Sequence, residues 1–395
     1  MRGLRLGRVF GIPIQLNWTF LLILPIFAWV IGSDIGRLTG LVNDFLGGSI
    51  AADPLTAGLT PWLLGSAAAA GLFVGVLLHE LGHSLVAMRY GVEIESITLW
   101  LLGGVANFKE IPEDWRQEFS IAIAGPVVSV VVGVGSFVAF LVLPPSLDAV
   151  RFVVGYLALM NVGLAAFNML PGFPMDGGRV LRALLARTRP HARATKIASE
   201  VGKTFAFVLG MLGLFAFSPI MILLAFFIYI AASGEAQQSA IKSAFQGVTV
   251  GDIMTPEREL LVADPKTTIG DLLTRMLTER HTGYPVVDSR GALIGMVTLD
   301  DARSVNEVER DAYRVEDVMQ RDVPTITPNA DAFTALQRIQ DGDIGRLPVV
   351  DAAGNLVGIV SKTDLMTAFN VIQSRGETTT GLQQTGSGSE FPSIR

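Results

Sequence analysis

The chain has 395 residues, of which 50% are hydrophobic and only 17% are charged, and its formal net charge at pH 7 is −6. A soluble globular domain usually carries about 25% charged residues, so an entirely soluble chain is not expected. The acidic balance gives no reason to expect a nucleic-acid partner. The sequence contains no cysteine, which excludes disulfides, thiolate metal ligands and a cysteine nucleophile.

Charged residues are almost absent from segments 10–32, 61–90, 117–143, 152–172 and 198–233. A membrane-spanning helix requires about 20 mostly apolar residues. We interpret residues 12–32 as a retained first helix, because no small-residue cleavage site follows the basic start of the chain. The last segment is too long for one span and is interrupted at Ser218-Pro219, which makes two helices. We therefore predict a six-span membrane core over residues 1–235, followed by a linker at 236–247.

Basic residues gather in alternate connections between the predicted spans. Arg2, Arg5 and Arg8 precede the first span, and Arg and Lys recur between residues 179 and 196, whereas Arg37 is the one basic residue of the connection 33–60. The positive-inside rule places the basic connections in the cytoplasm. We expect a multi-pass protein of the cell (inner) membrane with both termini in the cytoplasm.

Residues 92–98 alternate apolar and polar side chains and include β-branched residues, which favours a β-strand. Gly103-Gly104 marks a turn, and residues 105–108 can return as a second strand. We predict a short membrane-associated β-hairpin between spans two and three. Its edge offers a place where an extended peptide can pair.

The second half of the sequence repeats itself and has the composition of a soluble α/β domain. The run Gly283-Tyr284-Pro285-Val286-Val287-Asp288 matches Arg346-Leu347-Pro348-Val349-Val350-Asp351, and each is followed by a Gly-x-Val-Thr/Ser segment that ends at Asp301 or Asp364. Such self-similarity indicates two copies of one supersecondary unit packed together. We place the copies at 248–305 and 313–370. The tail 374–395, rich in Gly, Ser, Thr and Gln, is expected to be disordered.

Two of the four histidines flank a glutamate in the run His79-Glu80-Leu81-Gly82-His83, inside the second predicted span. At positions i and i+4 the two imidazoles share one helical face and can bind one metal ion. Glu80 is adjacent to them and can act as a general base toward water. The alternative is a group of polar residues paired with one another inside the bundle. Ionisable groups within a span are costly, however, and are functional by default.

A catalytic zinc ion needs three protein ligands and one open position, so a third ligand is required, which without cysteine must be His, Asp or Glu. His281 lies in the soluble half and His191 in a basic connection, so both are poor candidates. Asp176 suits better, because it follows a Pro- and Gly-rich break at the end of span four, beside Asn168. Irregular backbone at membrane depth is tolerated where it lines a cavity or is buried in protein. An ordinary helix-ending turn is the alternative for the Pro-Gly portion.

Together these motifs resemble those of the site-2 protease family: HELGH at 79–83, Ala-Gly-Pro at 124–126, and the run 168–178 of the form N-x-x-P-x-x-P-x-D-G-G. The prokaryotic branch with six spans and a C-terminal CBS pair is most similar. The resemblance implies Zn2+ held by His79, His83 and Asp176, with Glu80 as general base and Asn168 orienting the substrate or stabilising the oxyanion. It also implies cleavage within a transmembrane segment of a single-span partner, such as a membrane-bound regulator.

The two soluble repeats resemble CBS motifs, which pair into one module. This resemblance implies an adenine nucleotide, ATP, ADP or AMP, at the positions occupied by Thr298, Asp301, Ser361 and Asp364. A purely structural module that joins two copies of the chain into a homodimer is an equally weighted alternative. The two aspartates can also simply cap the helices that follow them.

Two other interpretations of the whole chain belong to different functional classes. The first is a membrane transporter or channel gated by the CBS pair, but the remaining spans contain almost none of the polar residues that a continuous pathway needs. The second is an inactive receptor that only binds helices. An inactive receptor would not need the four residues of the predicted site, and all of them are present: His79, Glu80, His83 and Asp176.

Overall fold

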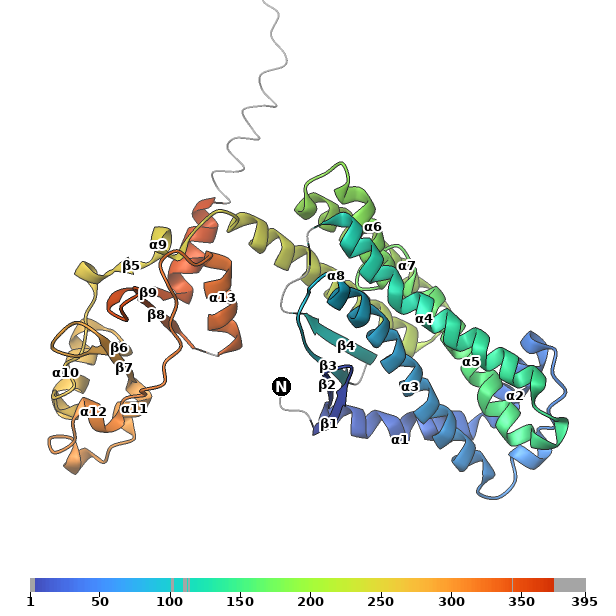
Figure 1. The fold of residues 1–395 in the computed structure, drawn as a ribbon. Coiled ribbons are helices and arrows are strands. Elements are labelled where there is room, and N and C mark those ends of the chain that lie inside the picture. Colours follow the sequence, from blue (N-terminus) through green and yellow to red (C-terminus); the bar gives the residue numbers. More distant parts are fainter. Residues whose placement is uncertain (1–3, 101–102, 109–111, 113, 343, 373–395) are drawn as a thin grey trace, which may run out of the picture. The chain divides into compact units, whose positions relative to one another are not determined.

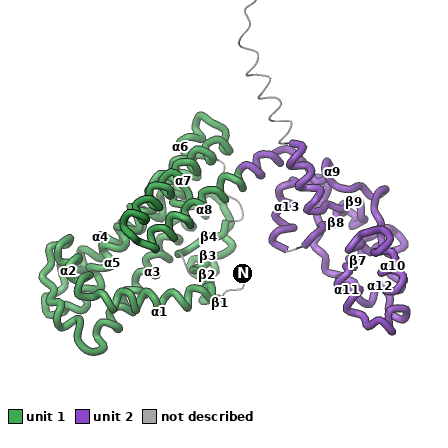
Figure 2. The backbone as a smooth tube through the Cα atoms, turned by 180° about the vertical axis from the view of Figure 1, so that it is seen from behind, with its two compact units in different colours: residues 1–239 green, residues 240–395 purple. Residues whose placement is uncertain are grey.

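The computed structural model describes residues 4–100, 103–108, 112, 114–342 and 344–372, and these fall into two compact units, 1–239 and 240–395 (Figures 1 and 2). The first unit is a bundle of helices with one small sheet, and the second is an α/β unit. This agrees with the predicted fold class. The tail predicted to be disordered, 374–395, lies outside the described residues.

Long apolar helices dominate the first unit. In the described part of the chain, five helices are long and apolar enough to cross a membrane: α3 (Thr60–Arg89), α4 (Trp115–Val142), α5 (Asp148–Asn168), α7 (His191–Phe215) and α8 (Pro219–Ala244). The pair α1 (Trp18–Ser33) and α2 (Ile35–Leu46) passes the same test only together, and it is bent by 75°. The short helix α6 (Asp176–Ala186) lies between α5 and α7, and η1 (Asp53–Leu55) and η2 (Pro145–Leu147) are single turns.

The first predicted span is shorter than expected, because residues Ile12–Leu16 form strand β2 instead of helix. Ile12, Ile14 and Leu16 are buried and alternate with less buried residues, which is the period of a strand. Helix α1 begins only at Trp18, where the side chain of Asn17 accepts a hydrogen bond from the Thr19 amide at 3.0 Å and caps the helix. The prediction of six spans stays a prediction, since α1 reaches a sufficient length only with α2.

A four-stranded sheet lies beside the helices in the order β1 (Leu4–Val9), β2, β3 (Ile94–Trp100) and β4 (Gly103–Phe108). The predicted hairpin corresponds to β3 and β4, which pair antiparallel. Strand β2 pairs parallel with β3, with Ile14 opposite Ile97, and this partnership with the start of the chain was not predicted. Strand β4 ends the order, so one of its edges is without a strand partner among the described residues.

The second unit contains the two predicted repeats and two hydrophobic cores, and each core includes residues from the start of the other repeat, Val250 in one and Val315 in the other. The first comprises α9 (Val250–Ile253), β5 (Thr255–Pro256), η3 (Glu257–Glu259), α10 (Ile269–Glu279), β6 (Gly283–Val287), β7 (Leu293–Thr298) and α11 (Leu299–Arg303). The second, after η4 (Glu307–Glu309), comprises α12 (Val315–Val318), α13 (Ala332–Asp341), β8 (Arg346–Val350), β9 (Leu356–Ser361) and helical residues 362–372. β6 pairs antiparallel with β7, and β8 with β9, with a bulge at the corresponding place. The residues predicted as a linker, 236–247, are helical as far as Ala244.

Candidate metal centre

Three side chains meet between α3 and the start of α6. His79 and His83 lie one turn apart on α3, and their Nε2 atoms are 3.2 Å apart. Oδ2 of Asp176, the first residue of α6, is 3.1 Å from Nε2 of His79 and 3.2 Å from Nε2 of His83. Both histidines are buried, and the Asp176 side chain is 13% exposed. Three potential ligand atoms therefore converge on one point, as a tetrahedral zinc site with one open position requires.

The other nitrogen of each imidazole is held by α4. Nδ1 of His83 donates to the carbonyl oxygen of Ile121 at 2.7 Å, and Nδ1 of His79 lies 2.9 Å from Oγ of Ser129. A proton on Nδ1 leaves the lone pair of Nε2 free for a metal ion. This pattern of outer hydrogen bonds is the one that orients histidine ligands in zinc enzymes.

The Ala-Gly-Pro motif of residues 124–126 lies where α4 passes the imidazole of His83. A Cβ atom built on Gly125 would stand only 2.6 Å from Cε1 of His83. Real Cβ atoms essentially never come that close. Glycine at this position therefore makes the space that the metal-binding side of the imidazole occupies.

The segment between α5 and α6 presents Asp176 to the histidines. The backbone of residues 169–173 packs directly against the first turn of α6, where a Cβ on Gly177 would lie 2.5 Å from the Met169 carbonyl oxygen and a Cβ on Gly178 would lie 2.5 Å from the Gly172 carbonyl carbon. The two glycines after Asp176 thus permit the close packing that brings its carboxylate into the bundle. The Phe173-Pro174 peptide bond in this segment is cis.

The side chain of Glu80 on α3 reaches strand β4 of the small sheet. It is half-buried, and a Cβ built on Gly104 of β4 would lie 2.5 Å from its Cγ and 3.2 Å from its Oε1. The glutamate carboxylate and the backbone of the edge strand β4 are therefore neighbours.

Asn168 ends α5, and its side-chain amide donates to the Leu164 carbonyl of the same helix at 3.0 Å. Among the described residues, no hydrogen bond joins Asn168 to His79, His83 or Asp176. The role in orienting substrate or stabilising the oxyanion therefore stays a prediction.

A buried ion-pair cluster behind the metal centre was missed in the sequence. Nε of Arg182 on α6 donates to Oε1 of Glu118 on α4 at 2.6 Å, and its Nη1 donates to Oε1 of Glu235 on α8 at 2.8 Å. The guanidinium also covers the ring of Phe173, 4.8 Å from its centroid. Arg182 and Glu118 are buried. The cluster, defined as Glu118, Arg182 and Glu235, ties the helix of Asp176 to the helix that carries Ser129 and Ile121.

The four residues singled out in the repeats form two matching capping boxes. Oδ2 of Asp301 accepts from the amide of Thr298 at 2.8 Å and from its hydroxyl at 2.6 Å. Oδ2 of Asp364 accepts from the amide of Ser361 at 2.9 Å and from its hydroxyl at 2.7 Å. This is the geometry of helix caps, the local role considered for both aspartates. Their part in nucleotide binding stays a prediction.

A buried His-His-Asp cluster with oriented imidazoles, set among membrane-length helices, is the arrangement expected of a membrane-embedded metallohydrolase. The models of peptidase family M50 match residues 67–152 and 146–209, and the CBS domain model matches 250–306 and 315–371. The chain is 33% identical over 375 residues to a zinc metalloprotease of Methanocaldococcus jannaschii, covering 95% of this chain and 98% of that one.

Two solved structures are also similar. The site-2 protease from Methanocaldococcus jannaschii is 35% identical and covers 60% of this chain and 95% of its own, with a TM-score of 0.41. The CBS-pair protein CBSX2, solved in complex with AMP, is 30% identical and covers 32% of this chain and 99% of its own, with a TM-score of 0.30.

The chain belongs to peptidase family M50, the site-2 proteases, and carries a C-terminal pair of CBS domains. It is a zinc metalloprotease and an integral membrane protein, and the family acts on membrane-bound substrates. The predicted family, enzyme class and metal are thereby confirmed, and the transporter interpretation is not favoured.

Proposed function

We propose that His79, His83 and Asp176 hold the single zinc ion and that Glu80 is the general base of an intramembrane endopeptidase. The observation that carries this proposal is the convergence of three ligand atoms, with both imidazoles oriented from behind by Ile121 and Ser129. Zinc held there supplies a Lewis acid that polarises the carbonyl of the scissile peptide bond.

Glu80 is placed to take a proton from the attacking water and to pass it to the leaving amine. The water oxygen bonds to the carbonyl carbon and negative charge gathers on the carbonyl oxygen. That oxygen then re-forms the C=O bond, the C–N bond breaks, and the amine leaves with the proton from Glu80. The proximity of Glu80 to Gly104 of β4 supports this proposal, because a backbone paired with β4 would lie beside the carboxylate. Asn168, at the end of α5, is proposed to orient the substrate or to stabilise the oxyanion.

The unpartnered edge of β4 is proposed to hold the substrate. The peptide groups of a transmembrane helix form hydrogen bonds within the helix, so the helix must unwind locally before a peptide bond can be cleaved. An unwound substrate segment that pairs with β4 would form backbone hydrogen bonds with this strand in place of its lost helical ones. The proposed substrate is therefore a single-span protein, such as a membrane-bound regulator, in the inner membrane, with both termini of the protease in the cytoplasm.

This proposal is tested by co-expressing the full chain with candidate single-span regulators and scoring release of the regulator from the membrane. Wild type should release a true substrate, and Glu80→Gln should not, because glutamine cannot accept the proton. A Glu257→Gln variant, at an exposed glutamate of the second unit, serves as control and should behave as wild type. Release that is equal in the wild type and the Glu80→Gln variant would rule out Glu80 as the base.

For the second unit we propose binding of an adenine nucleotide at Thr298, Asp301, Ser361 and Asp364, and pairing of two chains. In each capping box the aspartate uses Oδ2, so its Oδ1 atom takes no part in the cap. Among the described residues, Oδ1 of Asp301 accepts only one hydrogen bond, from the Gln320 side-chain amide at 3.2 Å. A carboxylate oxygen of this kind can accept from ribose hydroxyls.

Calorimetric titration of the full chain with ATP, ADP and AMP tests nucleotide binding. Asp301→Asn should weaken it, whereas Asp252→Asn should not, because Asp252 forms a similar capping box with Thr249 at the start of α9. No heat from any nucleotide would favour the purely structural module. Sedimentation of the same sample in detergent reports whether two chains pair.

A further inference from the structure

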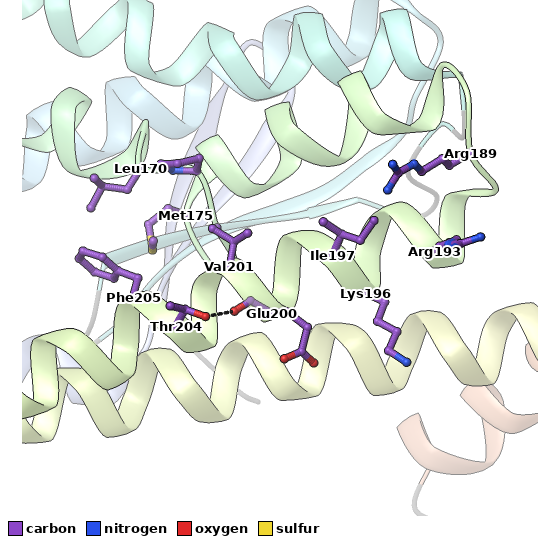
Figure 3. A pocket seen from close by; sticks show the side chains of 12 residues that line it. Leu170, Met175, Arg189, Arg193, Lys196, Ile197, Glu200, Val201, Thr204 and Phe205 are labelled. Carbon is purple, nitrogen blue, oxygen red and sulfur yellow. Dashed lines mark hydrogen bonds between the residues drawn. The ribbon is translucent and has the colours of Figure 1, made fainter.

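A pocket of about 670 Å³ opens beside the first half of α7, where the segment before Asp176 packs against that helix (Figure 3). This volume lies within the range typical of small-molecule sites, about 300–1,000 Å³. Its walls are mainly apolar and include Leu170, Met175, Ile197, Val201 and Phe205. None of the proposed metal ligands lines the pocket, so it is distinct from the metal centre.

The rim of the pocket is basic. Arg189, which precedes α7, and Arg193 and Lys196, which lie in its first two turns, all line the pocket. All three are exposed, and among the described residues no carboxylate lies within ion-pair distance of any of them. Glu200 also lines the pocket, but its carboxylate is paired with Nζ of Lys203 at 3.0 Å. The rim therefore carries a net positive charge without an internal counter-ion.

The charged and apolar parts of the pocket are separated along α7. Lys196 and Phe205 are nine residues apart, which corresponds to about 14 Å along a helix. One leaflet contributes about half of the roughly 30 Å hydrocarbon core of a bilayer. The pocket therefore matches an amphipathic ligand with an anionic group at one end and a chain one leaflet long.

We propose that this pocket binds an anionic phospholipid from the leaflet at which α7 begins. Its phosphate lies among Arg189, Arg193 and Lys196, and an acyl chain follows Ile197, Val201 and Phe205. The positive-inside rule accounts for the three cations, but not for an apolar pocket that begins beside them. Because Leu170 and Met175 belong to the segment that ends at Asp176, a bound lipid braces the backbone that presents this carboxylate.

The proposal is tested by titrating the purified full chain in neutral detergent with a fluorescent phosphatidylglycerol. Phosphatidylcholine with the same chains, and inorganic phosphate as competitor, are measured beside it. A basic residue near a membrane surface contributes about fivefold to binding of an anionic lipid. The double substitution Arg193→Gln and Lys196→Gln should therefore weaken phosphatidylglycerol binding by about 25-fold, and Val201→Trp, which fills the apolar part, should weaken it as well.

Arg187→Gln is the matched control. Arg187 belongs to the same basic segment, but its guanidinium covers the ring of Trp115, 4.9 Å from the centroid, and does not line the pocket. This variant should bind phosphatidylglycerol as the wild type does. Each variant is checked for one zinc per chain, so that a misfolded protein is not mistaken for one that has lost the site.

Three outcomes would overturn the proposal. Equal affinity for phosphatidylcholine, unchanged in the double variant, would mean unspecific contact with detergent-like chains. Full competition by inorganic phosphate at equal concentration would mean an anion site without a chain. Binding of an acidic peptide from a substrate in place of phosphatidylglycerol would assign the pocket to the substrate. None of these readouts requires cleavage, so they remain informative even if the proposed endopeptidase activity is wrong.

Discussion

Gly125 of α4 faces the imidazole of His83 so closely that any side chain at residue 125 would overlap the ring. The same helix holds the opposite side of that ring, through the 2.7 Å hydrogen bond from Nδ1 to Ile121. His83 is thus confined from two directions by a single neighbouring helix. This confinement sets where Nε2 points, and with it the position of the metal.

We predict that Gly125→Ala destroys the zinc site. The added methyl group must displace His83. Removing a hydrogen-bond partner of a metal ligand can weaken metal binding by about 100-fold. Displacing the ligand itself should weaken zinc binding by more than that. Zinc content per purified chain measures it. Gly135→Ala is the matched control on α4, because a Cβ there meets nothing within 4 Å. Full zinc occupancy in Gly125→Ala would show that His83 is not a ligand in this orientation.

Ser129→Ala should weaken zinc binding by about 10- to 100-fold, because Nδ1 of His79 loses its partner. Competition for zinc against a chelator of known affinity measures the change. Ser120→Ala tests specificity on the same helix, since the Ser120 hydroxyl is bonded only to the Arg116 carbonyl in its own helix. Equal affinities for the two variants would contradict a role of Ser129 in orienting His79.

Arg182→Met should destabilise the first unit by up to about 3–5 kcal/mol, because the buried Glu118 carboxylate keeps only its 3.5 Å contact with Nε2 of His191. The double variant with Glu118→Gln should recover much of that loss, since no buried charge remains. Thermal unfolding followed by tryptophan fluorescence measures this in the full chain, because all five tryptophans lie within the first 115 residues.

Lys203→Met removes the partner of an ion pair whose Glu200 side chain is 58% exposed. It should change the free energy of unfolding by at most about 1 kcal/mol. If Arg182→Met were as mild as Lys203→Met, the cluster of Glu118, Arg182 and Glu235 would not hold the helices together.

Gly104→Val should reduce cleavage by about 100-fold while zinc content stays at one per chain, because the new side chain pushes the Glu80 carboxylate away from the reacting atoms. The cleavage rate and zinc content of the same preparation test this. Leu6→Ala is the control in the same sheet, since Leu6 lies on β1, at the other end of the strand order from β4, and its side chain is 58% exposed. Loss of zinc together with activity would instead place Gly104 against a ligand.

The local patterns were sufficient for the elements that rest on sequence periodicity. The i, i+4 spacing of His79 and His83 already implies a shared helical face, and the repeated Pro-Val-Val-Asp runs imply two equivalent units. Asp176 was reached from the number of ligands that zinc requires, and its closeness to both imidazoles agrees with that reasoning.

Contacts between segments far apart in the chain could not be predicted from the sequence. Ile12–Leu16 has the alternation of a strand, but it is continuous with an apolar stretch that also suits a helix, and short apolar runs cannot be distinguished by period alone. Its parallel pairing with β3 depends on tertiary structure. The contact of Arg182 with Glu118 likewise joins residues with no local signal between them.

In the proposed mechanism, Glu80 performs proton transfer at a zinc site formed by His79, His83 and Asp176. The most direct test is the cleavage rate of a single-span substrate by the full chain in liposomes, with zinc content determined on the same samples. Glu80→Gln should keep one zinc per chain and show no detectable cleavage. Cleavage by Glu80→Gln at the wild-type rate would contradict this mechanism.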